Sequence, residues 1–458
     1  MYNWLVPHIF FPVHERISRH RFWSQFLELK KLQWASEEQL QERALGKLKR
    51  LIIHAYEHVP YYREVFLGSG MRPHDIASLP DMERVPFTTK PDVRTNFPGR
   101  ITAENLPTKR YKTGRTSGST GFPLEFYADV GRMDTVRSSY LLLWSWAGIA
   151  PWVPGFHIVS PAHHRFESGL RSVLSRLIRR LVLGERLIAM EAHMLEPERL
   201  AEEVRNLGKG TRYFIWTPPS RAARLAREMD ERGVCLPEYP SALISYSETL
   251  SAFDRDILQT AFQCPVFNYY GTQELPFLAQ TCPDNPDVLH VNSERALVRV
   301  VKENGTDARP GERGRIVITD FSNYVMPLIN YDIGDYAVKG DRCTCGRGFP
   351  TLERVEGRTF EAVTTPTGLS YSSGMLSDFL CLEWDAVPYV WEYQFVQTGP
   401  EDVELKIVPT RLFNKDFSTM LKHKFEELLE REVRFHIELV DRVEVEPSGK
   451  RFVVKSNL

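Results

Sequence analysis

The sequence of 458 residues lacks a long apolar run, an excess of charge and a dense set of cysteines. No segment approaches the roughly 20 consecutive apolar residues of a bilayer-spanning helix, so we expect no membrane span. The 58 basic and 59 acidic residues leave a net charge of -1, which argues against a protein that binds nucleic acid mainly by neutralising phosphates. Six cysteines are too few for a disulfide framework in so long a chain, which predicts a reducing, cytoplasmic setting.

The length predicts two or three domains, and the patterning differs along the chain. From Ser36 onward the sequence has the apolar spacing of one amphipathic helix, with a capping box of Ser36 and Gln39 at its start and an end expected near Val59 and Pro60. From about residue 130 to 330, helical stretches alternate with short β-branched or aromatic runs, which predicts a layered α/β domain with mainly parallel strands. Short antiparallel strands are predicted after residue 295, and a compact α+β unit at the C-terminal end.

One loop, residues 113–123 (TGRTSGSTGFP), combines three glycines with five hydroxyl side chains. It is not a Walker A sequence, because no Gly-Lys-Ser/Thr follows. Successive backbone N–H groups near glycines can nevertheless wrap a polyphosphate, and Ser117, Ser119 and Thr120 add hydroxyl donors. Taken alone, this composition favours an exposed Ser/Gly turn.

Four further motifs follow this loop along the chain. Residues 268–274 (NYYGTQE) come directly after an apolar strand, at the edge of an α/β sheet where ligands bind. Residues 330–335 (NYDIGD) place a carboxylate behind a glycine. Residues 356–358 (EGR) and 447–450 (PSGK) complete the series. Each motif is weak alone, but five of them in this order form a specific pattern.

The ordered motifs resemble the adenylate-forming superfamily of acyl-CoA synthetases, and stretches such as HAYEHVPYYREVF, VPFTTKPDVR and CTCGRGFP resemble its phenylacetate–CoA ligase and CapK-like branch. This resemblance implies a large N-terminal adenylation domain over residues 1–357, made of a layered α/β part and a small β subdomain. It also implies a small mobile α+β domain over residues 358–458, with a hinge just after Arg358.

The resemblance also assigns roles to individual residues. It places ATP phosphates on the glycine-rich loop, at Thr116, Ser117, Gly118, Ser119, Thr120 and Gly121. The remaining nucleotide contacts fall on Ser247, Glu248, Asn268, Tyr269, Tyr270, Gly271 and Asp335. Asn268 and Tyr270 would meet the adenine and Asp335 the ribose hydroxyls. Three residues would be catalytic: Glu274 as a Mg²⁺ ligand, Arg358 beside the ribose or phosphate, and Lys450 at the α-phosphate and the attacking carboxylate.

The implied activity is that of an AMP-forming acid–thiol ligase. ATP would convert a carboxylic acid, aryl or arylacetic by analogy, into an acyl adenylate with release of pyrophosphate, and the acyl group would pass to coenzyme A. The sequence departs from the family at Gln273, at Ser247 where a glycine is usual, and at Phe360 where an aspartate is usual. These departures leave the acceptor open: it could be an amine, a carrier-protein thiol or a hydroxyl. The substrate could be an unusual acid. The alternative class of protein is a non-catalytic nucleotide-binding scaffold.

Two further side-chain groups stand out. Cys282, His290, Cys343 and Cys345 lie in turn-rich sequence and make up a full tetrahedral set for a structural Zn²⁺, an arrangement similar to that of CapK-like proteins; four unpaired residues on separate loops are the alternative. Aromatic residues are expected to line an acyl pocket, although plain core is the more frequent role of such side chains. The candidates are Trp144, Trp146, Trp216, Tyr246 and Tyr269.

Overall fold

A computed structural model describes residues 2–18, 20–105, 111–115, 124–159, 185–189, 196–358, 362–367, 370–373, 376, 379–380, 384, 386, 388–429, 433–445 and 451–456. The chain divides into two compact units. Unit 1 comprises Met1–Trp146 and Tyr269–Val355, and unit 2 comprises Ala147–Asn268 and Glu356–Leu458. The domain boundary expected between residues 357 and 358 stays a prediction.

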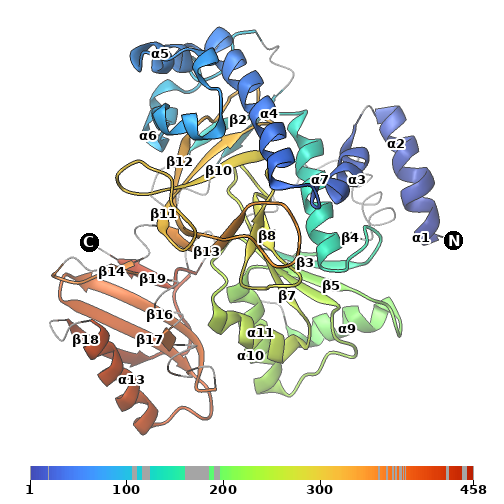
Figure 1. Ribbon diagram of the computed structural model, residues 1–458. Coiled ribbons are helices and arrows are strands. Elements are labelled where there is room, and N and C mark those ends of the chain that lie inside the picture. Colours follow the sequence, from blue (N-terminus) through green and yellow to red (C-terminus); the bar gives the residue numbers. More distant parts are fainter. Residues whose placement is uncertain are drawn as a thin grey trace. The chain divides into compact units, whose positions relative to one another are not determined.

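Helices dominate the N-terminal half of unit 1 (Figure 1). They are α1 (Tyr2–Leu5), α2 (Phe11–Ser18), α3 (Phe22–Leu32), α4 (Glu37–His58), α5 (Pro60–Gly68), α6 (Lys90–Asn96) and α7 (Arg132–Trp146). The expected capping box of α4 is confirmed, because the Gln39 N–H donates to the Ser36 hydroxyl and the Gln39 side chain accepts from the Ser36 N–H. The helix ends at His58, just before the extended residue that precedes Pro60.

The strands of unit 1 form two sets. β1 (Tyr111–Arg115) and β2 (Glu125–Asp129) pair antiparallel, and β1 includes residues 113–115, the start of the segment predicted as the glycine-rich loop. A larger sheet has the order β10-β11-β12-β13-β9-β8-β7. Its strands are β8 (Ala279–Thr281), β9 (Leu289–Val291), β10 (Ala296–Val301), β11 (Arg313–Asp320), β12 (Tyr331–Lys339), β13 (Thr351–Arg358) and the end of β7. The antiparallel texture predicted after residue 295 is therefore confirmed.

The first part of unit 2 is a parallel α/β sheet with the order β4-β3-β5-β6-β7. Its strands are β3 (Gly155–Val159), β4 (Glu185–Ala189), β5 (Phe214–Thr217), β6 (Ala242–Ser245) and the start of β7 (Val266–Tyr270). Helices α9 (Pro197–Leu207), α10 (Pro219–Arg232) and α11 (Ala252–Phe262) alternate with these strands. The predicted parallel α/β layer is therefore confirmed for these strands, whereas β8 and β9, which also lie within residues 130–330, pair antiparallel.

The C-terminal part of unit 2 is the predicted α+β structure (Figure 1). Its main sheet has the order β18-β17-β16-β19, and α13 packs against it through Phe417, Leu421 and Phe425. The elements are β14 (Ala362–Thr364), β15 (Ser370–Ser372), β16 (Val390–Gly399), β17 (Asp402–Pro409), α13 (Lys415–Leu428), β18 (Arg434–Leu439) and β19 (Val454–Ser456). One apolar core joins this sheet to α10 and α11. Among the described residues, no helix combines the length and the apolar character needed to cross a bilayer.

Candidate functional site

The turn that follows β7 is tightly packed and forms part of the candidate site in unit 1. A Cβ on Gly271 would lie 2.7 Å from both the Leu275 carbonyl oxygen and the Phe277 nitrogen, so only glycine fits there. Thr272 and Leu275 close the turn with two hydrogen bonds, from the Thr272 N–H to the Leu275 carbonyl and from the Leu275 N–H to the Thr272 hydroxyl, each 3.0 Å. This compact geometry determines where the backbone of Glu274 lies.

Glu274 has the chemistry that the predicted Mg²⁺ site requires. Its carboxylate is buried, and its Oε1 accepts a hydrogen bond from the Tyr331 hydroxyl at 3.3 Å. Burial, and then the charge of Glu274, raise the pKa of Tyr331 well above its ordinary value, so the phenol stays protonated and donates. A buried carboxylate oxygen oriented by a neutral donor is a hard ligand of the kind that Mg²⁺ prefers.

Two predicted nucleotide-binding residues also meet in unit 1. Tyr270, at the end of β7, donates its hydroxyl hydrogen bond to Asp335 Oδ2 at 2.6 Å. Asp335 is buried on β12 and follows Gly334, whose φ of 79° lies in the left-handed region that favours glycine. The two residues lie 65 positions apart in sequence, and the fold joins their motifs through this bond.

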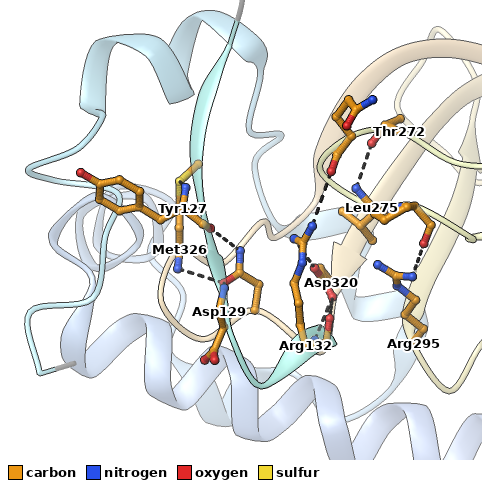
Figure 2. Close-up of polar contacts among 12 residues, drawn as sticks. Tyr127, Asp129, Arg132, Thr272, Leu275, Arg295, Asp320 and Met326 are labelled. Atoms are coloured by element: carbon orange, nitrogen blue, oxygen red, sulfur yellow. Dashed lines mark hydrogen bonds and ion pairs between the residues drawn. The ribbon is translucent and has the colours of Figure 1, made fainter. Parts of the chain in front are cut away.

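Three buried charged residues near the same turn escaped the sequence analysis (Figure 2). Arg132, at the start of α7, donates to the Gln273 carbonyl at 3.5 Å and lies 3.9 Å from Asp320 Oδ2. Arg295 donates to the Pro276 carbonyl. Because arginines are common on surfaces, only tertiary partners distinguish these two from the others.

The predicted residues of unit 2 lie where β6 and β7 end. Ser247 has a φ of 71°, which explains why a glycine is usual at this position of the family. Glu248 accepts hydrogen bonds from the N–H of Ser220 at 3.1 Å, its hydroxyl at 2.9 Å, and the N–H of Arg451 at 3.1 Å. Asn268 lies beside Ser245 in the register of β7 with β6. Nucleotide contacts of these residues stay predictions.

Arg451, the residue after Lys450, is anchored in unit 2 by an ion pair that sequence analysis did not predict. Its Nη2 lies 2.8 and 2.9 Å from the two carboxylate oxygens of Asp254, which is in the first turn of α11. Both residues are buried. A charged residue beside a candidate catalytic lysine was visible in the sequence, but its partner lies 197 positions away.

The predicted aromatic pocket set divides between the two units. In unit 2, Trp216 stacks on His157 with ring centroids 4.2 Å apart, and His157 Nε2 lies 2.8 Å from the Tyr246 hydroxyl oxygen. His157 was missed, although it is the register partner of Trp216 between β3 and β5. In unit 1, Trp144 and Trp146 are buried on α7, and Tyr269 stacks on Phe277.

The four predicted zinc ligands lie together in unit 1. Their ligand atoms all fall within 4.8 Å of one another. The Sγ atoms of Cys343 and Cys282 are 3.8 Å apart, and Cys345 Sγ is 3.4 Å from His290 Nε2. Zinc bonds of about 2.3 Å to sulfur and about 2.0 Å to nitrogen give tetrahedral edges of about 3.8 and 3.5 Å, which match both distances.

The surroundings of this cluster also suit a metal. His290 Nδ1 lies 3.2 Å from the Phe349 carbonyl oxygen, the outer hydrogen bond that orients a ligating imidazole. Burial lowers the pKa of His290, so the ring is neutral at pH 7, as a ligand must be. The Arg347 N–H donates to Cys345 Sγ at 3.4 Å, which stabilises a thiolate.

Several predicted site residues lie outside the described residues. They are Thr116, Ser117, Gly118, Ser119, Thr120, Gly121 and Lys450, together with the side chain of Arg358 and with Phe360. Their roles stay predictions from the motifs.

The fold is a mixed α/β fold similar to that of solved adenylate-forming ligase structures. The structure matches a 2-hydroxyisobutyryl-CoA ligase, in the postadenylation state with an acyl-AMP, at a TM-score of 0.72 and 19% identity over 93% of this chain and 91% of that chain. Residues 365–457 match the family model of the CapK C-terminal domain.

Two relatives extend the likeness along most of the sequence. The phenylacetate–coenzyme A ligase of Thermus thermophilus is 24% identical over 428 residues, which span 88% of this chain and 89% of that protein. Protein CapK of Staphylococcus aureus is 22% identical over 408 residues, which span 87% and 85%. The resemblance to the phenylacetate–CoA ligase and CapK-like branch is thereby confirmed.

Proposed function

We propose that this protein is an ATP-dependent, AMP-forming ligase that activates a carboxylic acid as an acyl adenylate and then transfers the acyl group to coenzyme A. The observation that carries the proposal is the hydrogen bond between Tyr270 and Asp335, which unites two of the five motifs. The relatives named phenylacetate–CoA ligase support the same activity.

The first step has simple requirements. A carboxylate oxygen of the acid attacks the α-phosphorus of ATP, the bond to the bridging oxygen breaks, and pyrophosphate leaves with the electron pair. In the second step a thiol attacks the acyl carbonyl and AMP leaves. Little covalent work falls to the protein, so positioning and charge neutralisation provide most of the catalysis.

Each proposed site residue has a task in this scheme. Asp335 accepts from the ribose hydroxyls, and its bond to Tyr270 orients the phenol ring for stacking on adenine. Glu274 would hold Mg²⁺, which neutralises phosphate charge when bound. Lys450 would steady the α-phosphate and the attacking carboxylate, and Arg358 the ribose or phosphate.

An aromatic acid is the proposed substrate class. The stacked pair of His157 and Trp216, with Tyr246 bonded to the histidine, offers ring faces and one polar contact at the carboxyl ends of parallel strands. The names of the phenylacetate–CoA ligase relatives favour an aryl or arylacetic acid.

Coenzyme A is the proposed acceptor because these relatives are named as coenzyme A ligases. An amine is the second candidate, since the fold also matches the amide bond synthetase McbA of Marinactinospora thermotolerans at a TM-score of 0.53 and 15% identity over 75% of this chain and 68% of that chain. A carrier-protein thiol is a third. We place the reaction in the cytoplasm, where ATP, coenzyme A and reduced cysteines coexist.

We further propose that Cys282, His290, Cys343 and Cys345 bind one structural Zn²⁺. The matched tetrahedral edges and the neutral histidine support this assignment. Four protein ligands leave no open position, so the ion would stabilise the loops around β9 and β13 rather than take part in the reaction.

The function is tested by ATP–pyrophosphate exchange with Mg²⁺ and a panel of aryl, arylacetic, fatty and hydroxy acids, without coenzyme A. We expect exchange with one aromatic class, and its loss in Lys450→Ala while ATP binding persists. Coenzyme A, hydroxylamine and amines then identify the acceptor. ATP binding with no exchange for any acid would support the non-catalytic scaffold instead.

A further inference from the structure

The turn that carries Glu274 is held from both sides by two buried arginines (Figure 2). Arg132 donates to the carbonyl of Gln273, immediately before Glu274, and Arg295 donates to the carbonyl of Pro276, two residues after it. The turn's own hydrogen bonds join Thr272 and Leu275. The two flanking carbonyls are therefore held by side chains from elsewhere in unit 1.

One carboxylate balances both guanidinium groups. Asp320 Oδ2 lies 3.9 Å from Arg132 Nη1, and the negative charge of Asp320 also acts on Arg295. Asp320 is itself fixed, because its Oδ1 accepts from the N–H and the hydroxyl of Ser322 at 2.8 and 2.6 Å. Arg132 thus connects α7 to the turn, and its ion pair with Asp320 links it to the end of β11.

Such an arrangement is costly. Arg132 is 5% exposed, and Arg295 and Asp320 are 0% exposed. Burial lowers the pKa of Arg295 to about 10, with Asp320 opposing the shift. Removing ions of this size from water carries a large penalty, and buried pairs are often replaceable by apolar side chains without loss of stability. Two buried arginines directed at the carbonyls around one glutamate therefore point to a positional role.

We propose that Arg132 and Arg295 are positioning residues that hold the turn of residues 271–276 so that Glu274 presents its carboxylate to Mg²⁺. The inference rests on the proposed function, in which Glu274 is the metal ligand. The arginines act through the backbone and not on the substrate. Asp320 keeps the two guanidinium groups on the carbonyls and offsets their charge near Glu274.

The test compares equilibrium binding of ATP in the presence of Mg²⁺ and of EDTA, without acid, so that no turnover is needed. Wild-type protein should bind ATP more tightly with Mg²⁺ than with EDTA. We call this ratio of affinities the metal gain, and Glu274→Gln should lose it. We expect Arg132→Lys and Arg295→Lys to reduce the metal gain about five- to tenfold, while affinity for metal-free ATP stays unchanged. Lysine keeps the charge, but its flexible stem does not fix a donor on the carbonyl as the rigid guanidinium does.

Arg299→Lys is the matched control. Arg299 is a buried arginine of unit 1 that donates to the Met82 carbonyl at 2.9 Å, to Asn330 at 2.8 Å and to Asp307 at 2.9 Å, and none of these partners belongs to the turn. It should lower thermal stability as the other variants do and keep the full metal gain. If Arg295→Lys fails to fold, Arg132→Lys carries the test alone.

The outcomes separate the two levels of inference. A wild-type gain that survives in Arg132→Lys overturns the positioning role and leaves the proposed function intact. Equal ATP affinity with Mg²⁺ and EDTA in wild-type protein overturns the metal role of Glu274 and the positioning role together.

Discussion

Replacing Asp254 by Asn should be among the most destabilising single changes in unit 2. Asp254 is 0% exposed and Arg451 5% exposed, and both carboxylate oxygens lie within 2.9 Å of one guanidinium nitrogen. Breaking a buried pair by neutralising one partner costs about 3–5 kcal/mol, because the other charge is left buried. The substitution also perturbs the start of α11, where Asp254 accepts from the Ser251 hydroxyl at 2.8 Å.

The double variant Asp254→Asn with Arg451→Met isolates the pair. Removing both charges also removes the stranded guanidinium, so the double variant should lose less stability than the sum of the single variants. Urea unfolding followed by circular dichroism measures each free energy. The reasoning would be refuted by simple additivity, or by an Asp254→Asn variant as stable as wild type.

A matched control lies in the same unit. Asp402 on β17 and Arg434 on β18 form an ion pair at 2.7 Å, but the side chain of Arg434 is 62% exposed and that of Asp402 is 39% exposed. Exposed pairs contribute little because water and salt screen them. Asp402→Asn should therefore leave the unfolding midpoint unchanged, and a loss comparable to that of Asp254→Asn would show that pairing, and not burial, sets the magnitude.

Three further outcomes are expected. The purified protein should contain one zinc ion per chain, measured by mass spectrometry of metals. Cys343→Ser should abolish zinc binding and lower the melting temperature. Cys264→Ser, which lies outside the cluster, should keep the zinc. Tyr270→Phe loses the bond to Asp335 and should raise the KM for ATP about tenfold in pyrophosphate exchange, whereas an unchanged KM would exclude this bond from nucleotide binding. Burial raises the pKa of Glu392, although nearby arginines oppose the shift, so the folded state keeps this proton to higher pH than the unfolded state does. The free energy of unfolding should therefore fall as the pH rises from about 4.5. Glu392→Gln should reduce this fall when unfolding is measured as a function of pH.

Local features of the fold could be predicted because their signals are local. The capping box of Ser36 and Gln39 needs only four consecutive residues, and the helix α4 repeats its apolar face over six turns. The parallel strands of unit 2 were predicted from alternation with helices, which reflects a connection rule rather than any one contact. These predictions did not depend on knowing which strand pairs with which.

The candidate site was predictable only as far as its motifs. Tyr270, Glu274 and Asp335 were identified by motif order, and the fold then joined Tyr270 to Asp335. His157 was missed because a lone histidine in a strand has many roles, and its pairing with Trp216 exists only in the register of β3 with β5. A side chain that functions through a cross-strand partner carries little signal in its own neighbourhood.

The buried charged residues are the part of this protein that the sequence predicts least well. Arg132, Arg295 and Arg451 have ordinary neighbours in sequence, and their partners lie on remote segments. Removing a guanidinium from water carries a large free-energy cost, which hydrogen bonds and a counter-charge offset in part. In unit 1, Arg132 and Arg295 donate to the carbonyls on either side of Glu274. In unit 2, Arg451, the residue after Lys450, is paired with Asp254. The candidate catalytic residues Glu274 and Lys450 thus both lie next to buried arginines. This arrangement is expected if the buried charges serve to position these two residues rather than to stabilise the fold.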